Sequence, residues 1–167
     1  MEYQFADGFW WGSATSAPQS EGAAARDGKS RNIFDYWFEI APERFHDRVG
    51  PAEASTFYDH FRADIGLLKT LGHNTFRTSI SWSRLIPDGD GEVNPQAVAF
   101  YNAMIDELLA QGITPFINLY HFDMPLCMQQ RGGWESRAVV EAYARYADIC
   151  FGLFGDRVTH WFTFNEP

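Results

Sequence analysis

Polar side chains that can bind a ligand or transfer a proton occur at or near the ends of four apolar segments of this sequence. Gln19 follows the first segment, Arg77 lies within the second, His121 closes the third, and Asn165 and Glu166 close the fourth. An amide, a guanidinium, an imidazole and a carboxylate can together hydrogen-bond a ligand rich in hydroxyl groups. A carboxylate can also act as a general acid or base. These five residues are therefore candidates for a functional site.

Each candidate also has a structural interpretation when it is taken singly. Gln19 could be a solvated loop residue, and His121 could be a core histidine whose hydrogen bonds are satisfied. Arg77 must be paired if it is buried, because an unpaired interior guanidinium is very costly. An ion pair of Arg77 with Asp123 or Glu166 fits the sequence as well as a ligand contact does.

Aromatic residues near the same segment ends shift the balance towards a sugar site, because aromatic faces can stack on the C–H face of a sugar ring. These residues are Trp82, Tyr120 and Phe122. A metal centre fits less well, because no paired His or Cys stands at ligand spacing. The G-x-S-x-G elbow of nucleophilic serine catalysis is also absent. We therefore expect neither a metal nor a cofactor.

Composition narrows the class of protein further. The 167 residues are 46% hydrophobic and 17% aromatic, with a formal net charge of -9. Such a chain suits one folded domain, and its charge argues against nucleic-acid binding. No run approaches the roughly 18 apolar residues of a membrane span. The first residues, MEYQFADGFWWG, do not have the pattern of a signal peptide. We expect a cytoplasmic protein.

The elements that must position these residues alternate between strands and helices. The apolar patterns predict strands at 9–12, 75–82, 114–120 and 158–164, and helices at 54–71, 95–112 and 136–155. Alternation of this kind predicts a parallel sheet with right-handed crossovers. Either a doubly wound sheet or a (β/α) barrel would fit.

The barrel is favoured because residues 11–16 lack the glycine-rich phosphate loop of doubly wound folds. A complete (β/α)8 TIM barrel needs eight strands and roughly 250 residues, whereas four strands are predicted here. We expect residues 1–167 to form the first four βα units, the amino-terminal half of a single barrel domain. The remainder of the barrel or a second copy would complete the fold.

Six stretches distributed along the chain carry a resemblance to a known family. They are FWWGSATS (9–16), QSEG (19–22), FRTSISWSR (76–84), YHFDMP (120–125), GGW (132–134) and TFNEP (163–167). Together they resemble the amino-terminal part of glycoside hydrolase family 1, which contains β-glucosidases and 6-phospho-β-glucosidases. The resemblance implies a (β/α)8 barrel and a retaining glycosidase, in which two carboxyl groups act in a double displacement.

The resemblance also implies roles for the candidate residues. Gln19 and His121 would bind hydroxyls of the glycone, which is the sugar that is cleaved off. Asn165 would bind its 2-hydroxyl, and Glu166 would be the general acid/base. Arg77 would be a charged neighbour that holds the catalytic carboxylates in place.

Two positions depart from the usual family pattern. Pro18 stands where the family usually has tyrosine, and Phe122, a supporting residue, stands where it usually has tryptophan. Both variants are similar to those of bacterial 6-phospho-β-glycosidases, so 6-phospho-β-glucosides are the expected substrates. A plain β-glucosidase or β-galactosidase and a non-catalytic sugar-binding half barrel are the alternatives. The family's nucleophile motif, of the Thr-Glu-Asn-Gly type, has no match here, so we expect the chain alone to be inactive.

Overall fold

Four parallel strands form one sheet and lie in the same order as in the sequence. In the computed structural model, which describes residues 3–167, they are β1 (Gly12–Ala14), β2 (Thr75–Ser79), β3 (Thr114–Asn118) and β4 (His160–Phe162). Each strand is added on the same side of the previous one, whereas a doubly wound sheet reverses its direction of growth. This topology is that of the first four units of a (β/α)8 barrel.

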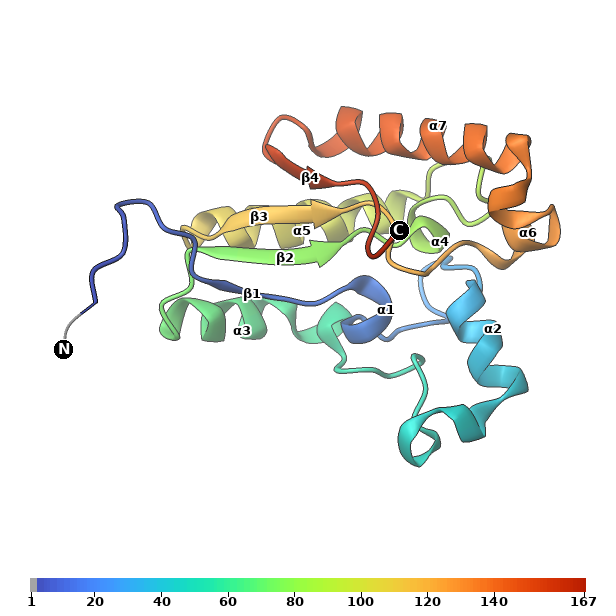
Figure 1. Ribbon diagram of the computed structural model, residues 1–167, viewed down its shortest axis with the longest axis horizontal. Helices are drawn as coiled ribbons and strands as arrows, with labels where there is room; N and C mark the ends of the chain where they lie inside the picture. Colours follow the sequence, from blue (N-terminus) through green and yellow to red (C-terminus); the bar gives the residue numbers. More distant parts are fainter. Residues whose placement is uncertain (1–2) are drawn as a thin grey trace.

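Three long helices make the crossovers between the strands. They are α3 (Phe57–Thr70), α5 (Pro95–Ala110) and α7 (Arg137–Phe154). In Figure 1, α3 lies along the β1 side of the sheet and α7 along the β4 side. Their buried residues recur every three or four positions, as expected for helices that cover a sheet with one face.

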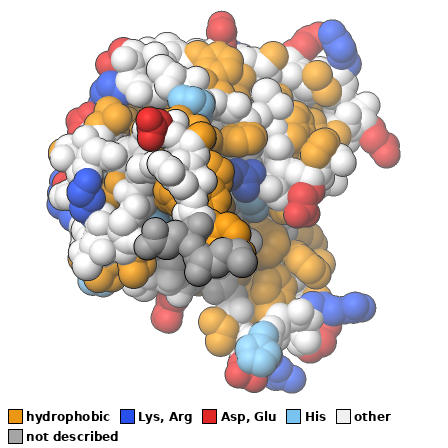
Figure 2. All heavy atoms as spheres, turned by 60° about the vertical axis from the view of Figure 1, so that its left-hand side comes forward, with side chains coloured by type: hydrophobic (Ala, Val, Ile, Leu, Met, Phe, Trp, Pro, Cys, Tyr) orange, Lys and Arg blue, Asp and Glu red, His pale blue; other side chains and the backbone are white. Residues whose placement is uncertain are grey.

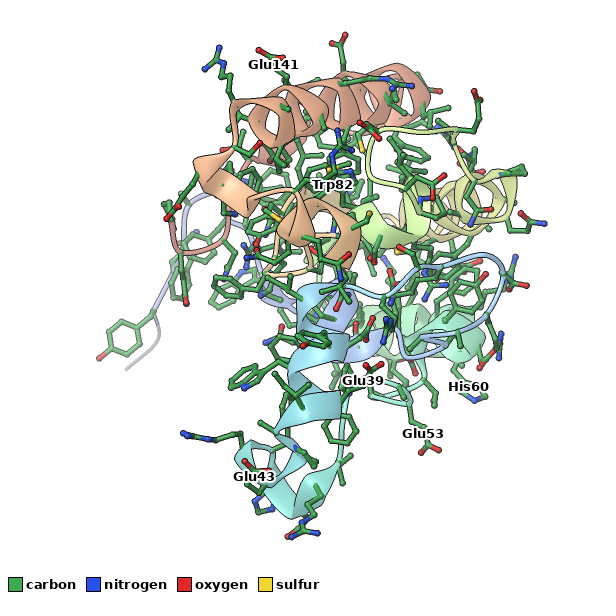
Figure 3. All side chains as sticks on the ribbon, turned by 90° about the vertical axis from the view of Figure 1, so that its right-hand side faces the viewer. Glu39, Glu43, Glu53, His60, Trp82 and Glu141 are labelled. Carbon is green, nitrogen blue, oxygen red and sulfur yellow. The ribbon has the colours of Figure 1, made fainter. Side chains whose placement is uncertain are left out.

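The core lies between these helices and the sheet. Ile65 of α3, Leu108 of α5 and Tyr146 of α7 are fully buried, together with Ile117 of β3. Trp82 is also fully buried, and Figure 3 shows it inside the molecule, whereas Glu141 points outward from α7. The predicted helices are therefore confirmed to within three residues at each end.

The first strand was predicted too early, at 9–12, whereas the sheet begins at Gly12. The aromatic run before it stays about half exposed, with 47% for Trp10 and 48% for Trp11. Gly12 is needed at the strand start because a Cβ there would lie 2.2 Å from the carbonyl oxygen of Thr75. The apolar run at 9–12 was misleading because aromatic content alone does not show which residues hydrogen-bond to a neighbouring strand.

The other three strands were predicted too long at their carboxyl ends. Residues after Ser79 leave the sheet, and Trp82–Leu85 form a short helix, α4. Similarly, β3 ends at Asn118 rather than at residue 120, and β4 spans His160–Phe162 rather than 158–164. Burial in the core, rather than strand pairing, accounts for the apolar residues beyond the strand ends.

The sequence analysis missed α2 (Ile33–Ile40), although a local signal for it exists. The Asn32 side chain accepts a hydrogen bond from the Asp35 amide at 2.8 Å, and Asp35 accepts one from the Asn32 amide at 3.0 Å. This reciprocal pair is a capping box with aspartate in the place of the usual glutamate or glutamine. In Figures 1 and 3, α2 and the segment after it project away from the sheet.

The remaining elements are short. They are α1 (Ala17–Ser20), α6 (Leu126–Gln130) and three 3-10 turns, η1 (Pro42–Arg44), η2 (His46–Arg48) and η3 (Gly133–Glu135). Within residues 3–167 we find no helix of the length and apolarity that crossing a bilayer requires.

The face of the sheet opposite the helices is open and aromatic. Phe116 of β3 stacks on His160 of β4 at 4.4 Å between ring centroids, and Trp10 contacts both rings. Figure 2 shows hydrophobic side chains grouped in the hollow on one side of the molecule. In a closed barrel this face would be the interior, which is filled by side chains from all the strands.

Candidate active site

One cavity brings together the five polar candidates and Phe122, whereas Trp82, which was also expected near a sugar, is fully buried against Tyr146 and does not line it. The cavity has a volume of about 290 Å³ and lies beyond the carboxyl ends of the strands, where (β/α) barrels place their sites. The singled-out residues that line it are Gln19, Arg77, His121, Phe122, Asn165 and Glu166, and Ala14, Thr15, Pro18 and Phe34 complete the wall. Residues up to 152 positions apart in the sequence, Ala14 and Glu166, thus share one surface.

Gln19 is exposed and lies on the short helix α1. Its Oε1 atom accepts a hydrogen bond from the Ser16 hydroxyl at 2.7 Å, which leaves the two N–H groups of the amide to face a ligand. The helix is tied to the sheet, because the Ala17 amide donates to Ser79 Oγ at 2.7 Å. Gln19 is therefore presented as a hydrogen-bond donor from a fixed backbone.

Arg77 hydrogen-bonds a side-chain amide rather than a carboxylate, which bears on the ion pair considered for it above. Its Nη2 atom donates to Asn165 Oδ1 at 2.9 Å, and its guanidinium lies 5.1 Å from the ring centroid of Phe162. The ion pairs found within residues 3–167 do not include Arg77, so the alternative of an ion pair with Asp123 or Glu166 is wrong for this structure. Asn165 is oriented by the bond, with its amide nitrogen left for a ligand.

His121 is buried, with 7% of its surface exposed, yet it lines the cavity. Its pKa is lowered, first by burial and then by the Arg77 charge, while Glu166 acts in the opposite direction. The ring is therefore neutral at pH 7, and a neutral imidazole has one N–H donor and one acceptor nitrogen.

Two non-glycine residues of the cavity have left-handed backbones. Phe122 has φ of +60° and Glu166 has φ of +49°. Such conformations cost about 1–2 kcal/mol in an L-residue and concentrate at functional sites. The turn at Phe122 is supported from behind by Asp123, which is fully buried and accepts from the His121 amide at 3.2 Å. Burial raises the pKa of Asp123 to about 6.

A second cavity adjoins the first and differs from it in chemistry. Its volume is about 500 Å³, and its walls are mostly aromatic: Tyr120, Phe122, Trp134 and Phe164, with Asn165, Glu166 and Pro167. Phe122, Asn165 and Glu166 line both cavities. Glu166 thus stands where a polar space meets an apolar one, a suitable place for a proton donor between two parts of one ligand.

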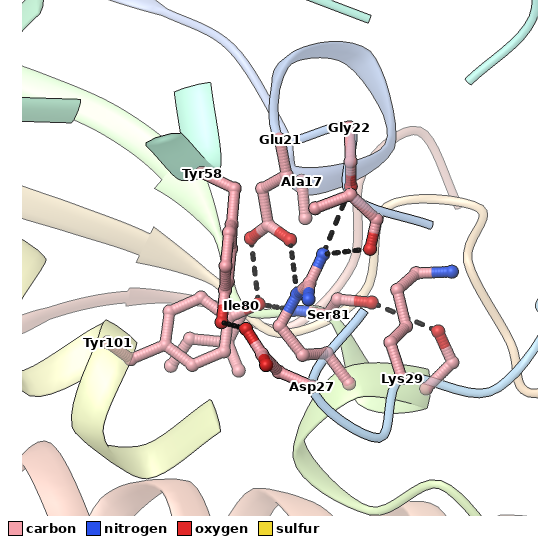
Figure 4. A network of polar contacts seen from close by, with 12 residues as sticks. Ala17, Glu21, Gly22, Asp27, Lys29, Tyr58, Ile80, Ser81 and Tyr101 are labelled. Atoms are coloured by element: carbon pink, nitrogen blue, oxygen red, sulfur yellow. Dashed lines mark hydrogen bonds and ion pairs between the residues drawn. The ribbon is translucent and has the colours of Figure 1, made fainter. Parts of the chain in front are cut away.

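A buried ion pair behind the cavity was not predicted. Arg84 Nε donates to Glu21 Oε2 at 2.8 Å, and the Tyr101 hydroxyl donates to Glu21 Oε1 at 2.7 Å (Figure 4). Arg84 Nη2 also donates to the Gly22 carbonyl at 3.1 Å. The pair ties residue 21, two positions after Gln19, to the core. Glu21 lies in the stretch QSEG (19–22) and Arg84 in FRTSISWSR (76–84). Their separation in the sequence did not indicate that the two would form an ion pair.

A metal centre finds no support in the described part of the chain. No group of three or more His, Cys, Asp or Glu side chains lies in a metal-binding arrangement within residues 3–167. The donors that line the cavity suit hydroxyl groups rather than a cation, since Arg77 contributes a positive charge.

Comparison with known proteins gives one consistent result. A family model described as glycosyl hydrolase family 1 matches residues 1–167. The 6-phospho-beta-glucosidase GmuD of Bacillus subtilis is 62% identical over 166 residues, which are 99% of this chain and 36% of that protein.

Solved structures agree with the family match. A beta-glucosidase from Thermotoga maritima in complex with castanospermine superposes with a TM-score of 0.94 at 40% identity, over 98% of this chain and 37% of that one. A mutant rice beta-glucosidase in a covalent complex with Glc superposes with a TM-score of 0.92 at 41% identity, over 95% of this chain and 33% of that one. The predicted fold, the first part of a (β/α)8 barrel, is confirmed.

Proposed function

The chain belongs to glycosyl hydrolase family 1, and from this membership we propose that residues 1–167 are the amino-terminal half of one barrel domain of a retaining β-glycosidase. The chain spans about a third of the length of the relatives it matches, for example 36% of GmuD, so the proposal concerns the protein in which the barrel is complete. The observation that carries it is the convergence of Gln19, His121, Asn165 and Glu166 on one cavity.

In this mechanism Glu166 is the general acid/base. It protonates the glycosidic oxygen as the bond to the aglycone breaks, and it later removes a proton from the water that attacks the sugar. Its place between a polar and an aromatic cavity fits a bond that joins a sugar to an aglycone. The covalent complex of the rice enzyme with Glc supports a covalent intermediate.

The other cavity residues bind the sugar in this proposal. The donor groups of Gln19, His121 and Asn165 hydrogen-bond its hydroxyls, and Asn165 takes the 2-hydroxyl, whose bond strengthens in the transition state. Arg77 holds the Asn165 amide in place through the bond at 2.9 Å. The double displacement requires two carboxyl groups, and neither a metal nor a cofactor takes part in it.

We propose 6-phospho-β-glucosides as the substrates and the cytoplasm as the location. The support is the 62% identity to a 6-phospho-beta-glucosidase, together with Pro18 and Phe122 in the cavity wall. The alternative is hydrolysis of unphosphorylated β-glucosides, to which the likeness to the Thermotoga maritima beta-glucosidase points, or of β-galactosides.

Substrate preference can be tested on the protein with the complete barrel. We expect kcat/KM for p-nitrophenyl 6-phospho-β-glucoside to exceed that for p-nitrophenyl β-glucoside by at least about 100-fold, because a site built for a charged group leaves polar partners unpaired when the group is missing. The matching pair of galactosides controls for the sugar. Equal values for the phosphorylated and free glucosides would overturn the choice of substrate and leave the β-glycosidase assignment intact.

The 167-residue chain by itself is expected to be inactive. A retaining enzyme needs two carboxyl groups about 5–5.5 Å apart, and within residues 3–167 Glu166 is the one carboxylate that lines the cavity. The measurement is release of p-nitrophenol by this chain from both glucosides, with the Glu166→Gln chain as control. Turnover above the control would refute this expectation. A sugar-binding homodimer without turnover, seen by light scattering and calorimetry, would support the non-catalytic alternative.

A further inference from the structure

Asn118 lies behind His121 and contacts it at the end of β3. It is fully buried, and its Nδ2 atom is 3.2 Å from His121 Nδ1. The same Nδ2 atom lies 3.0 Å from the carbonyl oxygen of Tyr120. Asn118 does not line the cavity, so any effect it has on a ligand must pass through His121.

The orientation of the Asn118 amide follows from its contact with Tyr120. A carbonyl oxygen can only accept a hydrogen bond, so the amide atom that faces it must be the nitrogen. With the amide turned over, its oxygen would face the carbonyl oxygen of Tyr120 and the bond would be lost. Asn118 Oδ1 has no hydrogen-bond partner within residues 3–167. Turning the amide would place this oxygen at His121 Nδ1, where it could accept only from a ring protonated on Nδ1. That single bond would replace the two that the observed orientation makes, to Tyr120 O and to His121 Nδ1.

The amide orientation in turn decides which ring nitrogen of His121 carries the proton. An amide nitrogen has two hydrogens, and here one faces Tyr120 O while the other faces His121 Nδ1. The Nδ1 atom must therefore accept. In a neutral imidazole the other nitrogen then carries the hydrogen. The donor of His121 is thus Nε2, the nitrogen that Asn118 leaves free for the cavity.

We propose that Asn118 is a positioning residue that fixes His121 as the neutral tautomer protonated on Nε2, so that the ring donates a hydrogen bond into the cavity. The identity of the acceptor, a sugar hydroxyl, rests on the proposed function, whereas the tautomer does not. A ring held in this way presents one donor in one direction. Less conformational entropy is therefore lost when a ligand binds.

The same contact opposes protonation of His121. In the imidazolium form Nδ1 would carry a hydrogen directed at an N–H of Asn118, and a hydrogen bond made only to the neutral form disfavours the charged one. The charged groups near the ring are Arg77, which acts in the same direction, and Glu166, which acts against it. Asp123 accepts from the backbone amide of His121.

The tautomer can be measured directly by NMR on the protein with ¹⁵N-labelled histidines, because ¹⁵N shifts and couplings separate a protonated ring nitrogen from an unprotonated one. The His121 signals are identified by their loss in His121→Gln. We expect an unprotonated Nδ1 and a protonated Nε2 at pH 7. A proton on Nδ1 in the unsubstituted protein would overturn the proposal, whatever the activity of the enzyme.

Two substitutions of similar size extend the test. Asn118→Asp replaces the donor by an acceptor, so we expect the ring proton to move to Nδ1 and the pKa of His121 to rise by about one to three pH units. Asn118→Leu removes the bond and should give a mixture of tautomers, with kcat/KM lowered about 5- to 10-fold, mainly through KM. A His121 pKa and tautomer unchanged in Asn118→Asp would contradict the proposal. Loss of activity with the expected tautomer in the unsubstituted protein would count against the proposed function instead.

Discussion

Replacement of Glu166 by glutamine is expected to lower the hydrolysis of unactivated β-glucosides by the complete barrel about 10²- to 10⁴-fold, the usual contribution of general acid–base catalysis. The amide has nearly the same shape and still lines both cavities. It cannot give a proton to the leaving oxygen or take one from water. The substitution therefore removes proton transfer and leaves the binding groups in place.

The leaving group separates this role from a binding role. An aryl group whose phenol is strongly acidic leaves without protonation, so formation of the glycosyl-enzyme should be almost unchanged with a dinitrophenyl glycoside. Hydrolysis of the glycosyl-enzyme should then limit turnover. Added azide should accelerate the breakdown of the glycosyl-enzyme, because azide attacks the sugar without the help of a base. Glu141→Gln is the matched control, since Glu141 points outward from α7 (Figure 3) and should have no effect. The assignment of Glu166 as general acid/base would be refuted by an equal loss of rate with both leaving groups and no acceleration by azide.

Replacement of Arg84 by methionine is expected to lower the free energy of unfolding by about 3–5 kcal/mol, because it leaves a buried carboxylate without its partner. Arg84 and Glu21 have side chains that are 0% and 5% exposed. Burial lowers the pKa of Arg84, but contacts with Glu21 and Tyr101 outweigh this, and its pKa lies above the usual value. The Arg84 guanidinium also lies 4.3 Å from the ring centroid of Tyr58. The guanidinium that pairs with Glu21 therefore connects α4, which contains Arg84, with α3, which contains Tyr58.

Urea unfolding, followed by circular dichroism, measures the effect of Arg84→Met. The control is Arg137→Met, which breaks the exposed pair with Glu141, with side chains 84% and 68% exposed, and should change stability by less than about 1 kcal/mol. The double variant Glu21→Leu with Arg84→Met removes both charges and should regain part of the loss. If the single variant is as stable as the double one, the carboxylate is not held by Arg84.

A further consequence concerns binding, because the ion pair anchors the chain beside Gln19. Glu21 is joined to Arg84 at 2.8 Å and to the Tyr101 hydroxyl at 2.7 Å, from residues 63 and 80 positions away. Where the Arg84→Met protein still folds, KM should therefore rise more than kcat falls. The reason is that Gln19 contacts the sugar in the ground state as well as in the transition state.

The sequence by itself determined the repeating unit of the fold and the composition of the site. Helical periodicity located α3, α5 and α7, since each needs one apolar face for the sheet. Parallel strands bring their carboxyl ends to one edge, so polar residues after each strand had to meet there. That is why Gln19, His121, Asn165 and Glu166 line one cavity as expected.

Only the tertiary structure decided the partners of the buried and partly buried polar groups. Arg77 bonds Asn165, which is 88 residues away, and Glu21 bonds Arg84, which is 63 residues away. Asn118 was never singled out, although its position next to His121 orients that ring. The physical reason is that periodicity reports which face of an element is buried. The partner of a charge or amide depends instead on which side chain the fold brings within hydrogen-bond distance, whether it is 63 or 88 residues away or, as for Asn118 and His121, three residues away across the turn that follows β3.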